Sequence, residues 1–267
     1  MNTAFKISVT FLFLFAYLFA SFLISVLPVS ERARRSMRIR STSFFSRLGL
    51  ALFGVRVHVN RGSLPRTYNG CLVVSNHLSY LDVLDISSLL PSVFITSVEL
   101  KRTPVLGMLA RFGGSLFVER RKPSGLKQEL RDITRTLDQR FPVVLFPEGT
   151  TSNGDCVGQF KNPLFDAAVS AKADIFPFCL RYTKINGEPV SNGNRDAVFY
   201  YGGMKFFRHL PMLLSRKSVD VEVSPLKAVA VGAGSSRKEL AALAYDAIDA
   251  AYQAGRASGQ AVFADHR

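Results

Sequence analysis

The feature that most constrains this chain is an uninterrupted apolar run near its N-terminus. Residues 7–29 contain no charged side chain, and their sequence, ISVTFLFLFAYLFASFLISVLPV, is rich in Phe and Leu. At about 1.5 Å per residue, a helix of this length extends roughly 34 Å, which is enough to cross the hydrocarbon core of a bilayer. We therefore expect residues 1–30 to form an uncleaved membrane anchor.

Two alternatives to a membrane-spanning anchor exist for this segment. A cleaved signal peptide is disfavoured because the apolar run is long, only Lys6 precedes it, and no A-x-A-like cleavage site follows. A monotopic helix or hairpin that lies in one leaflet stays open. The charged flanks predict an inner (cytoplasmic) membrane location with the following domain in the cytoplasm. Only Lys6 precedes the apolar run, whereas five arginines follow it closely: Arg32, Arg34, Arg35, Arg38 and Arg40.

The positive charge of the chain is concentrated directly after the apolar run. Residues 31–66 hold nine arginines and one acid, and the whole chain carries a net charge of +14. Nucleic acid is disfavoured as the partner, because there is no RNP signature, zinc-finger spacing or basic-leucine pattern. Anionic membrane lipids explain a basic flank beside an apolar span better. We expect residues 31–66 to be a basic interfacial segment, with a short interfacial helix over residues 44–55.

Short β-branched runs then alternate with helical patterns, which is typical of an α/β fold with a mostly parallel central sheet flanked by helices. We predict a main domain over residues 67–230 and a C-terminal helix within residues 231–267. The expected strands are 55–59, 71–75, 93–97, 115–118, 143–146, 175–181, 197–201 and 219–223, and the expected helices are 80–90, 105–111, 126–140, 163–171 and 237–256. The three cysteines lie far apart without CxxC or Cys/His spacing, so neither a disulfide framework nor a zinc site is expected.

The first segment with chemical potential is NHLSYLD at residues 76–82, directly after an apolar strand. On one continuous helix His77 and Asp82 would point about 140° apart. They meet only if His77 lies on the turn before the helix and Asp82 lies in its first turn. There Asp82 can orient the imidazole and leave the other ring nitrogen free to take a proton. The alternative is an ordinary capping box, Ser79-x-x-Asp82, with His77 a bystander.

Three later segments also place polar groups at strand ends. Residues 113–122, GGSLFVERRK, end in three cations that suit phosphate, although a solvated basic turn explains them equally well. Residues 143–154, VVLFPEGTTSNG, break a buried strand into a turn in which Glu148 can bind a hydroxyl or a cation, but loops before helices have the same composition. The least specific segment comprises FKNP at 160–163 and ADIFPF at 173–178.

Together the four segments closely resemble the glycerolipid (lysophospholipid) acyltransferase family, which contains 1-acyl-glycerol-3-phosphate acyltransferases and a lyso-ornithine lipid branch. The family's blocks read NHxxxxD, a Gly-to-Phe-x-x-Arg block, FPEGTxS and a Pro-centred apolar strand. All four occur here in that order, between Ser75 and Pro177. Each block alone is weak, whereas the joint match is specific and identifies residues 67–230 as the expected catalytic domain.

The resemblance implies roles for individual residues. His77 would be the general base and Asp82 would orient it. The residues implied in acceptor binding are Arg120, Glu148, Gly149, Thr150, Thr151 and Pro177, of which Pro177 would help to shape the acceptor or acyl pocket. One departure concerns the third block, which most often ends EGTRS in the family, because this chain has Thr151 in place of that arginine.

The implied activity is O-acyl transfer from acyl-CoA or acyl carrier protein to the free hydroxyl of a lysophospholipid, with no metal and no bound cofactor. The alternative acceptor is lyso-ornithine lipid or another lysolipid without a phosphomonoester. Two readings of other classes remain. A thioesterase or lipid hydrolase is disfavoured by the lack of a G-x-S-x-G elbow. A non-enzymatic lipid-binding protein would keep its activity in cells without His77.

Overall fold

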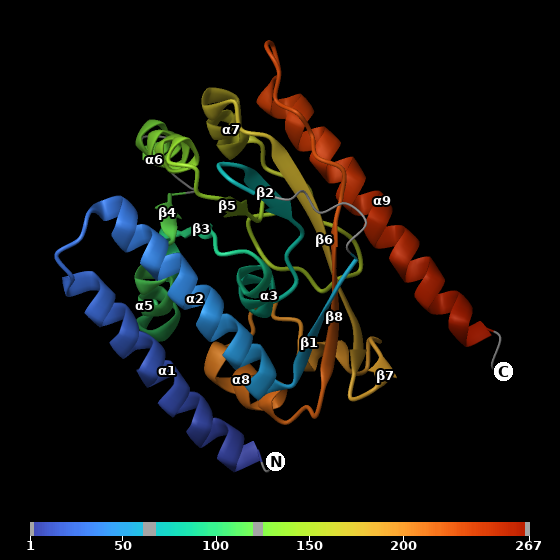
Figure 1. Ribbon diagram of the computed structural model, residues 1–267. Coiled ribbons are helices and arrows are strands. Elements are labelled where there is room, and N and C mark those ends of the chain that lie inside the picture. The colour runs from blue at the N-terminus through green and yellow to red at the C-terminus, as the bar shows by residue number, and fades with distance from the viewer. Residues whose placement is uncertain (1–2, 61–67, 120–124, 265–267) are drawn as a thin grey trace.

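The computed structural model describes residues 3–60, 68–119 and 125–264. Within these residues the centre of the fold is an eight-stranded sheet with the order β1-β8-β6-β2-β5-β3-β4, and β7 pairs with β6 (Figure 1). The strands are β1 Val55–Val59, β2 Leu72–Ser75, β3 Val93–Ser97, β4 Leu116–Val118, β5 Val143–Leu145, β6 Ile175–Ile185, β7 Glu188–Pro189 and β8 Val219–Pro225.

The sheet is mostly parallel, which confirms the expected fold class. Strand β2 pairs in parallel with β5 and β6, β3 pairs in parallel with β4 and β5, and β1 pairs in parallel with β8. Only β7 and β8 run antiparallel to their neighbour β6 among the described strands. Every residue of β2 and β5 is buried. The carboxyl ends of these central strands therefore open on one edge of the sheet, where α/β folds place their reactive groups.

Helices cover both faces of the sheet. In Figure 1, α1 and α2 lie on one side of the molecule, while α9 lies on the opposite side and packs along β6. The helices are α1 Thr3–Val26, α2 Glu31–Phe53, α3 Leu81–Leu89, α4 Val98–Lys101, α5 Pro104–Phe112, α6 Leu126–Asp138, α7 Asp166–Ala171, α8 Phe206–Leu214 and α9 Arg237–Ala264.

The expected short helix over residues 44–55 is wrong in extent, because it is the end of the single helix α2. Ser30 caps the start, and its side chain accepts a hydrogen bond from the N–H of Ala33. Gly54 ends the helix in the left-handed region with φ 75°. Arginine is a good helix former, so the basic run continues the helix. Helix α2 packs on α1 and α3, and the following strand β1 joins the central sheet.

The expected strand over residues 197–201 is also wrong. A short 3-10 helix, Arg195–Ala197, opens this segment, and a loop follows. The backbone of the loop bonds to the turn after β2 instead of to a strand, since Tyr200 N–H donates to Leu78 O and Ser79 Oγ donates to Val198 O. Helix α8 follows this loop and has no counterpart among the helices expected from the sequence.

Helix α1 turns its polar side toward the protein and its apolar side outward. The buried residues on it include Lys6, Thr10, Tyr17 and Ser21. Its large apolar side chains that stay exposed are Phe5, Phe11, Leu12, Phe15, Phe19, Phe22, Leu23 and Val26. Within the described residues, α1 is the one helix that is long and apolar enough to cross a membrane. This inverted pattern suits a surface that meets lipid rather than water.

Candidate active site

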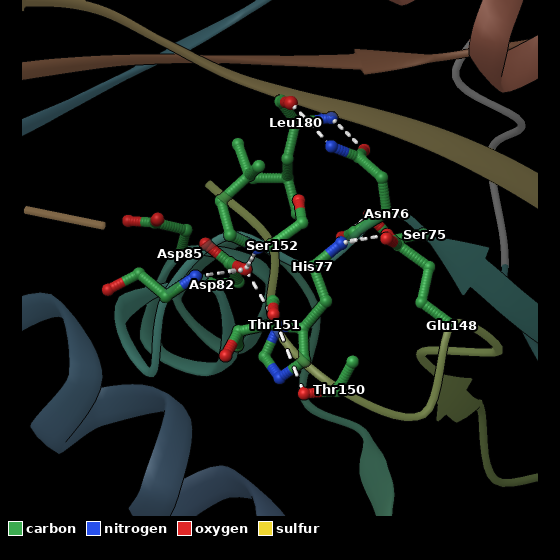
Figure 2. A network of polar contacts seen from close by, with 12 residues as sticks. Ser75, Asn76, His77, Asp82, Asp85, Glu148, Thr150, Thr151, Ser152 and Leu180 are labelled. Atoms are coloured by element: carbon green, nitrogen blue, oxygen red, sulfur yellow. Dashed lines mark hydrogen bonds and ion pairs between the residues drawn. The ribbon is translucent and has the colours of Figure 1, made fainter. Parts of the chain in front are cut away.

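The site begins where β2 ends, with Asn76 joining two strands. The side-chain amide of Asn76 donates to Leu180 O at 2.9 Å, and its oxygen accepts from Leu180 N–H at 2.8 Å. Asn76 thus continues the pairing of β2 with β6 by one more step, through a side chain. The next residue, His77, leaves the sheet at a defined position (Figure 2).

His77 and Asp82 meet as the turn geometry requires. His77 lies on the turn after β2, Asp82 lies in the first turn of α3, and His77 Nδ1 is 2.8 Å from Asp82 Oδ2. The same oxygen accepts from the N–H groups of Leu78 at 2.6 Å and Ser79 at 2.9 Å. Asp82 is fully buried. One of the two hydrogen bonds of a capping box is present, because Asp82 accepts from the Ser79 N–H. The other is replaced, because the Ser79 hydroxyl donates to Val198 O.

One face of the His77 imidazole packs against another ring, and its Nε2 atom has no hydrogen-bond partner among the described residues. Its ring stacks on Phe146 with centroids 4.0 Å apart and an interplanar angle of 14°. The side chain is 19% exposed. The Asp82 carboxylate fixes the proton of His77 on Nδ1, and no described residue hydrogen-bonds Nε2. A neutral imidazole held in this tautomer is suited to accept a proton at Nε2.

Glu148 ties the loop after β5 to the turn that carries His77. Its Oε1 accepts from His77 N–H at 2.7 Å and its Oε2 accepts from Gly158 N–H at 2.9 Å. A Cβ on Gly158 would lie 2.5 Å from Glu148 Oε2, so the loop needs glycine there. Burial raises the Glu148 pKa to about 7, together with the negative charge of Asp82 and against the two N–H donors.

The rest of this loop faces outward beside the histidine. Gly149 adopts φ 76°, and a Cβ there would lie 2.9 Å from Lys161 Nζ. Thr150 is exposed and Thr151 is half-buried. Ser152 N–H donates to His77 O at 2.9 Å. This one loop beside His77 therefore carries the Lys161 ammonium, the hydroxyls of Thr150 and Thr151, and the glycine backbone at position 149.

Of the other residues proposed from the sequence, one lies within the sheet and one lies outside the described residues. Pro177 is buried in β6 opposite Val74 in the sheet register. Arg120 lies outside the described residues, one position past Glu119. In the described part of the chain, no three His, Cys, Asp or Glu side chains gather as a metal site would require.

Three residues that organise the site were missed from the sequence. Asn76 carries a signal, since it opens the NHxxxxD block. Gly158 and Tyr182 carry none: Gly158 is ordinary for a loop, and Tyr182 lies one residue past the expected strand. The Tyr182 hydroxyl donates to Asp82 Oδ1 at 2.7 Å from a position 100 residues away in the chain.

The comparisons with known proteins agree on a family. The sequence model described as Acyltransferase matches residues 56–181. A lyso-ornithine lipid O-acyltransferase of Rhizobium meliloti (strain 1021) is 35% identical over 74% of this chain and 69% of its own length. A protein of the same name from Brucella abortus (strain 2308) is 32% identical over 79% of this chain and 80% of its own length. A 1-acyl-sn-glycerol-3-phosphate acyltransferase of Neisseria gonorrhoeae is 34% identical over 70% of both chains.

Solved structures include one with the same fold. It is the 1-acyl-sn-glycerophosphate (LPA) acyltransferase PlsC from Thermotoga maritima, with a TM-score of 0.69 over 96% of this chain and 95% of that chain. The two sequences are 19% identical, so this likeness concerns the fold alone.

The raised pKa of Glu148 predicts a pH-dependent stability. Because the carboxyl binds a proton more tightly in the folded state than in the unfolded chain, its contribution is fully present below about pH 4.5 and is lost as the pH rises through about 7. The shift from 4.5 to about 7 corresponds to roughly 3 kcal/mol of unfolding free energy. Glu148→Gln should abolish this part of the pH dependence in denaturant melts.

The matched control is Glu188→Gln, which changes an exposed glutamate on β7. In this control the unfolding free energy should decline between about pH 4.5 and 7 as much as in the wild type. An equal decline in the wild type and in Glu148→Gln would contradict the assignment of the titration to Glu148.

Proposed function

This chain belongs to the acyltransferase family, and we propose that it transfers a fatty acyl chain from a thioester to the free hydroxyl of a lysolipid in membrane lipid synthesis. The observation that carries the proposal is the buried Asp82 carboxylate on His77 Nδ1, with Nε2 left open. The donor is acyl-CoA or acyl carrier protein, both of which are acidic and suit a chain with a net charge of +14.

The transfer needs one base and no covalent enzyme intermediate, because a thioester is already activated. His77 Nε2 takes the proton of the acceptor hydroxyl as that oxygen attacks the thioester carbonyl. The ionised Asp82 stabilises the imidazolium that results. When the tetrahedral intermediate collapses, the carbon–sulfur bond breaks and the departing sulfur receives the proton from His77. Product ester and free thiol leave the enzyme in its starting state.

The role of His77 predicts a large loss of activity on substitution. His77→Ala should lower the rate of acyl transfer by about 10²- to 10⁴-fold, the usual cost of losing a general base, and Asp82→Asn should be similar or milder. The measurement is transfer of a labelled acyl chain from its thioester to a panel of lysolipids by membranes that contain the protein. Thermal melting and membrane partition should stay as in the wild type.

The chain offers a matched control in His58, whose Nε2 lies 2.9 Å from Asp220 Oδ1 on the β1–β8 pair. His58→Ala also breaks a His–Asp pair, and it should keep activity within about twofold. Near-full activity of His77→Ala would refute the mechanism. Release of free fatty acid that is unaffected by lysolipid would indicate a hydrolase instead.

We further propose that α1 lies in one leaflet rather than across the bilayer. Its contacts with α2, α5 and the end of α8 run along most of its length, from residue 6 to residue 25, a distance of roughly 28 Å. The contacts are Lys6 Nζ to Arg216 O, Tyr17 Oη to Leu109 O, and Arg38 Nη2 to Ser25 Oγ. If α1 crossed the membrane, the elements packed on it, including the arginine-rich α2, would enter the hydrocarbon as well.

Such burial is unfavourable, because an arginine at the centre of a bilayer costs several kcal/mol. A helix that lies flat avoids this cost and still buries its outward Phe and Leu side chains in lipid. The arginines of α2 can then meet anionic headgroups. The cytoplasmic leaflet has a negative surface potential that attracts clustered arginines, which supports the inner membrane, with the catalytic domain in the cytoplasm.

The one-leaflet arrangement predicts equal depth along α1. The chain has no tryptophan, so a single substitution gives a single fluorophore. Phe5→Trp, Phe15→Trp and Val26→Trp replace outward side chains that are 56%, 66% and 62% exposed. In vesicles with lipids brominated at defined depths, all three should be quenched by bromine at the same shallow depth.

The control is Leu243→Trp, which replaces a 47% exposed side chain on α9, on the other side of the molecule. It should not be quenched at any depth. A deep signal from Phe15→Trp, with shallow signals from Phe5→Trp and Val26→Trp, would show that α1 spans the bilayer, and the one-leaflet arrangement would then be wrong.

We propose that the acceptor carries no terminal phosphomonoester. A phosphomonoester has close to two negative charges, and each charge-assisted hydrogen bond to it adds about 1.5–3 kcal/mol, so a site for it gains from a second arginine. Thr151 stands where the family most often has that arginine. The relatives named above include both lyso-ornithine lipid and 1-acyl-sn-glycerol-3-phosphate enzymes. The opposing reading is that Lys161, whose ammonium lies over Gly149, supplies the second cation.

This proposal predicts the effect of restoring the arginine. Thr151→Arg should shift the acceptor preference toward lysophosphatidic acid over phosphate-free lysolipids such as lyso-ornithine lipid, measured as a ratio of kcat/KM values. Gln159→Arg adds the same charge at an exposed position of the same loop and should shift the ratio less. A wild-type protein that already prefers lysophosphatidic acid by about tenfold, or 1.4 kcal/mol, would rule the proposal out in favour of Lys161.

A further inference from the structure

A second carboxyl group lies behind the His77–Asp82 pair, and the mechanism above does not use it. Asp85 is on α3, one turn after Asp82, and both are 0% exposed. The hydroxyl of Tyr182, on β6, lies 2.7 Å from Asp82 Oδ1 and 2.8 Å from Asp85 Oδ2. Figure 2 shows Asp85 beside Asp82 on the side away from the imidazole.

The number of protons in this group is limited. A phenol has one proton to donate, and it stands at hydrogen-bond distance from two carboxyl groups. If both were ionised, one short oxygen–oxygen contact would have no proton, and two negative charges would share a water-free interior. One of the two carboxyl groups must therefore carry a proton and donate it to the Tyr182 oxygen.

The hydrogen-bond partners decide which carboxyl group is protonated. Asp82 Oδ2 already accepts two backbone N–H groups and the ring N–H of His77, and these donors stabilise the ionised form. Asp85 has no such support, because its Oδ1 has no hydrogen-bond partner within the part of the chain that the structure describes. Burial and the charge of Asp82 also raise the Asp85 pKa well above its usual range.

We propose that Asp85 is a protonated positioning residue that acts through Tyr182 to keep Asp82 ionised and correctly oriented for His77. The proposal rests on the function proposed for His77. Asp85 Oδ2–H donates to Tyr182 Oη, and Tyr182 Oη–H donates to Asp82 Oδ1. A phenol that accepts one hydrogen bond is a stronger donor of the next. Asp82 thus has donors on both oxygens, and it stays a carboxylate when His77 becomes an imidazolium.

Few other charged or titratable groups lie near the hydrogen bonds that join Asp85, Tyr182 and Asp82. On the open side are His77 and Glu148, which are joined through the His77 N–H. On α2, which packs against α3, Arg47 Nε donates to Ser88 O at 2.7 Å. None of these groups donates a hydrogen bond to Asp85 in the described residues, so no neighbouring cation offsets a negative charge there.

The proton on Asp85 can be observed directly. Infrared spectra of the full-length protein in an ester-free detergent should contain the carbonyl stretch of a buried protonated carboxyl group. At a pH well above 7, where Glu148 is ionised, the wild-type minus Asp85→Asn difference spectrum should retain this band. Absence of the band from that difference would overturn the proposal, whatever the activity of the variant.

The positioning role is tested by a pair of near-isosteric substitutions. Asp85→Leu removes the donor to Tyr182 and should lower kcat about tenfold, the size of effect expected for one net hydrogen bond, with KM little changed. Asp82 then interacts more strongly with the imidazolium, so the acid limb of the kcat/KM profile should move to higher pH. Asp85→Asn retains a donor and should recover most of the lost rate, with the acid limb at its wild-type position.

Two results would overturn the role. If Asp85 were ionised, Asp85→Asn would remove a buried negative charge and move the acid limb to lower pH. If Asp85 only filled space, Asp85→Leu would be as active as Asp85→Asn, provided that thermal melting shows both to be folded. Failure of the proposed function is distinguishable, because an active His77→Ala would leave the infrared band of Asp85 in place.

Discussion

The carboxylate of Asp82 is a buried negative charge that the surrounding backbone must compensate. No Lys or Arg in the described residues forms an ion pair with it, and its one ionic partner there is His77. Burial of a carboxylate costs several kcal/mol unless hydrogen bonds replace its water. The N–H groups of Leu78 and Ser79 therefore have to point inward, which determines the shape of the turn. The position of His77 follows from that turn, and Asn76 anchors the turn to β6.

Helix α1 and the His77–Asp82 pair belong to one packed unit. Helix α2 lies between α1 and α3, the helix that carries Asp82. At Gly49 of α2 the three helices approach closely, since a Cβ there would lie 3.3 Å from the Phe13 ring and 3.6 Å from Leu84. Even a methyl group at position 49 would require the Phe13 ring to shift by a few tenths of an ångström. The His77–Asp82 pair is thus held at a defined distance from the outward face of α1, which suits the proposed reaction between a lipid and a water-soluble donor.

The sequence predicted those parts of the structure that depend on local patterns. Apolar β-branched runs identified the central strands, and the spacing of His77 and Asp82 predicted their placement on a turn and a first helical turn. The missed features depend on partners far along the chain. Tyr182 reaches Asp82 across 100 residues, and residues 197–201 have a strand-like composition but bond to the turn after β2. The first half of helix α2 was missed because this basic stretch has no apolar periodicity.

The loop after β5 has a buried part and an outward part, and the proposed function gives the two parts different tasks. In its buried part, Glu148 accepts from the N–H groups of His77 and Gly158, so under the proposed function this part would affect every acceptor alike. Its outward part, Thr150 and Thr151, is free of the contacts that hold the His77–Asp82 pair. A substitution in the outward part can change the charge offered to a headgroup without moving the base. Under the proposed function, proteins with the same buried contacts around His77 can therefore differ in acceptor preference. The headgroup of the acceptor then has to be inferred from the exposed positions of the loop.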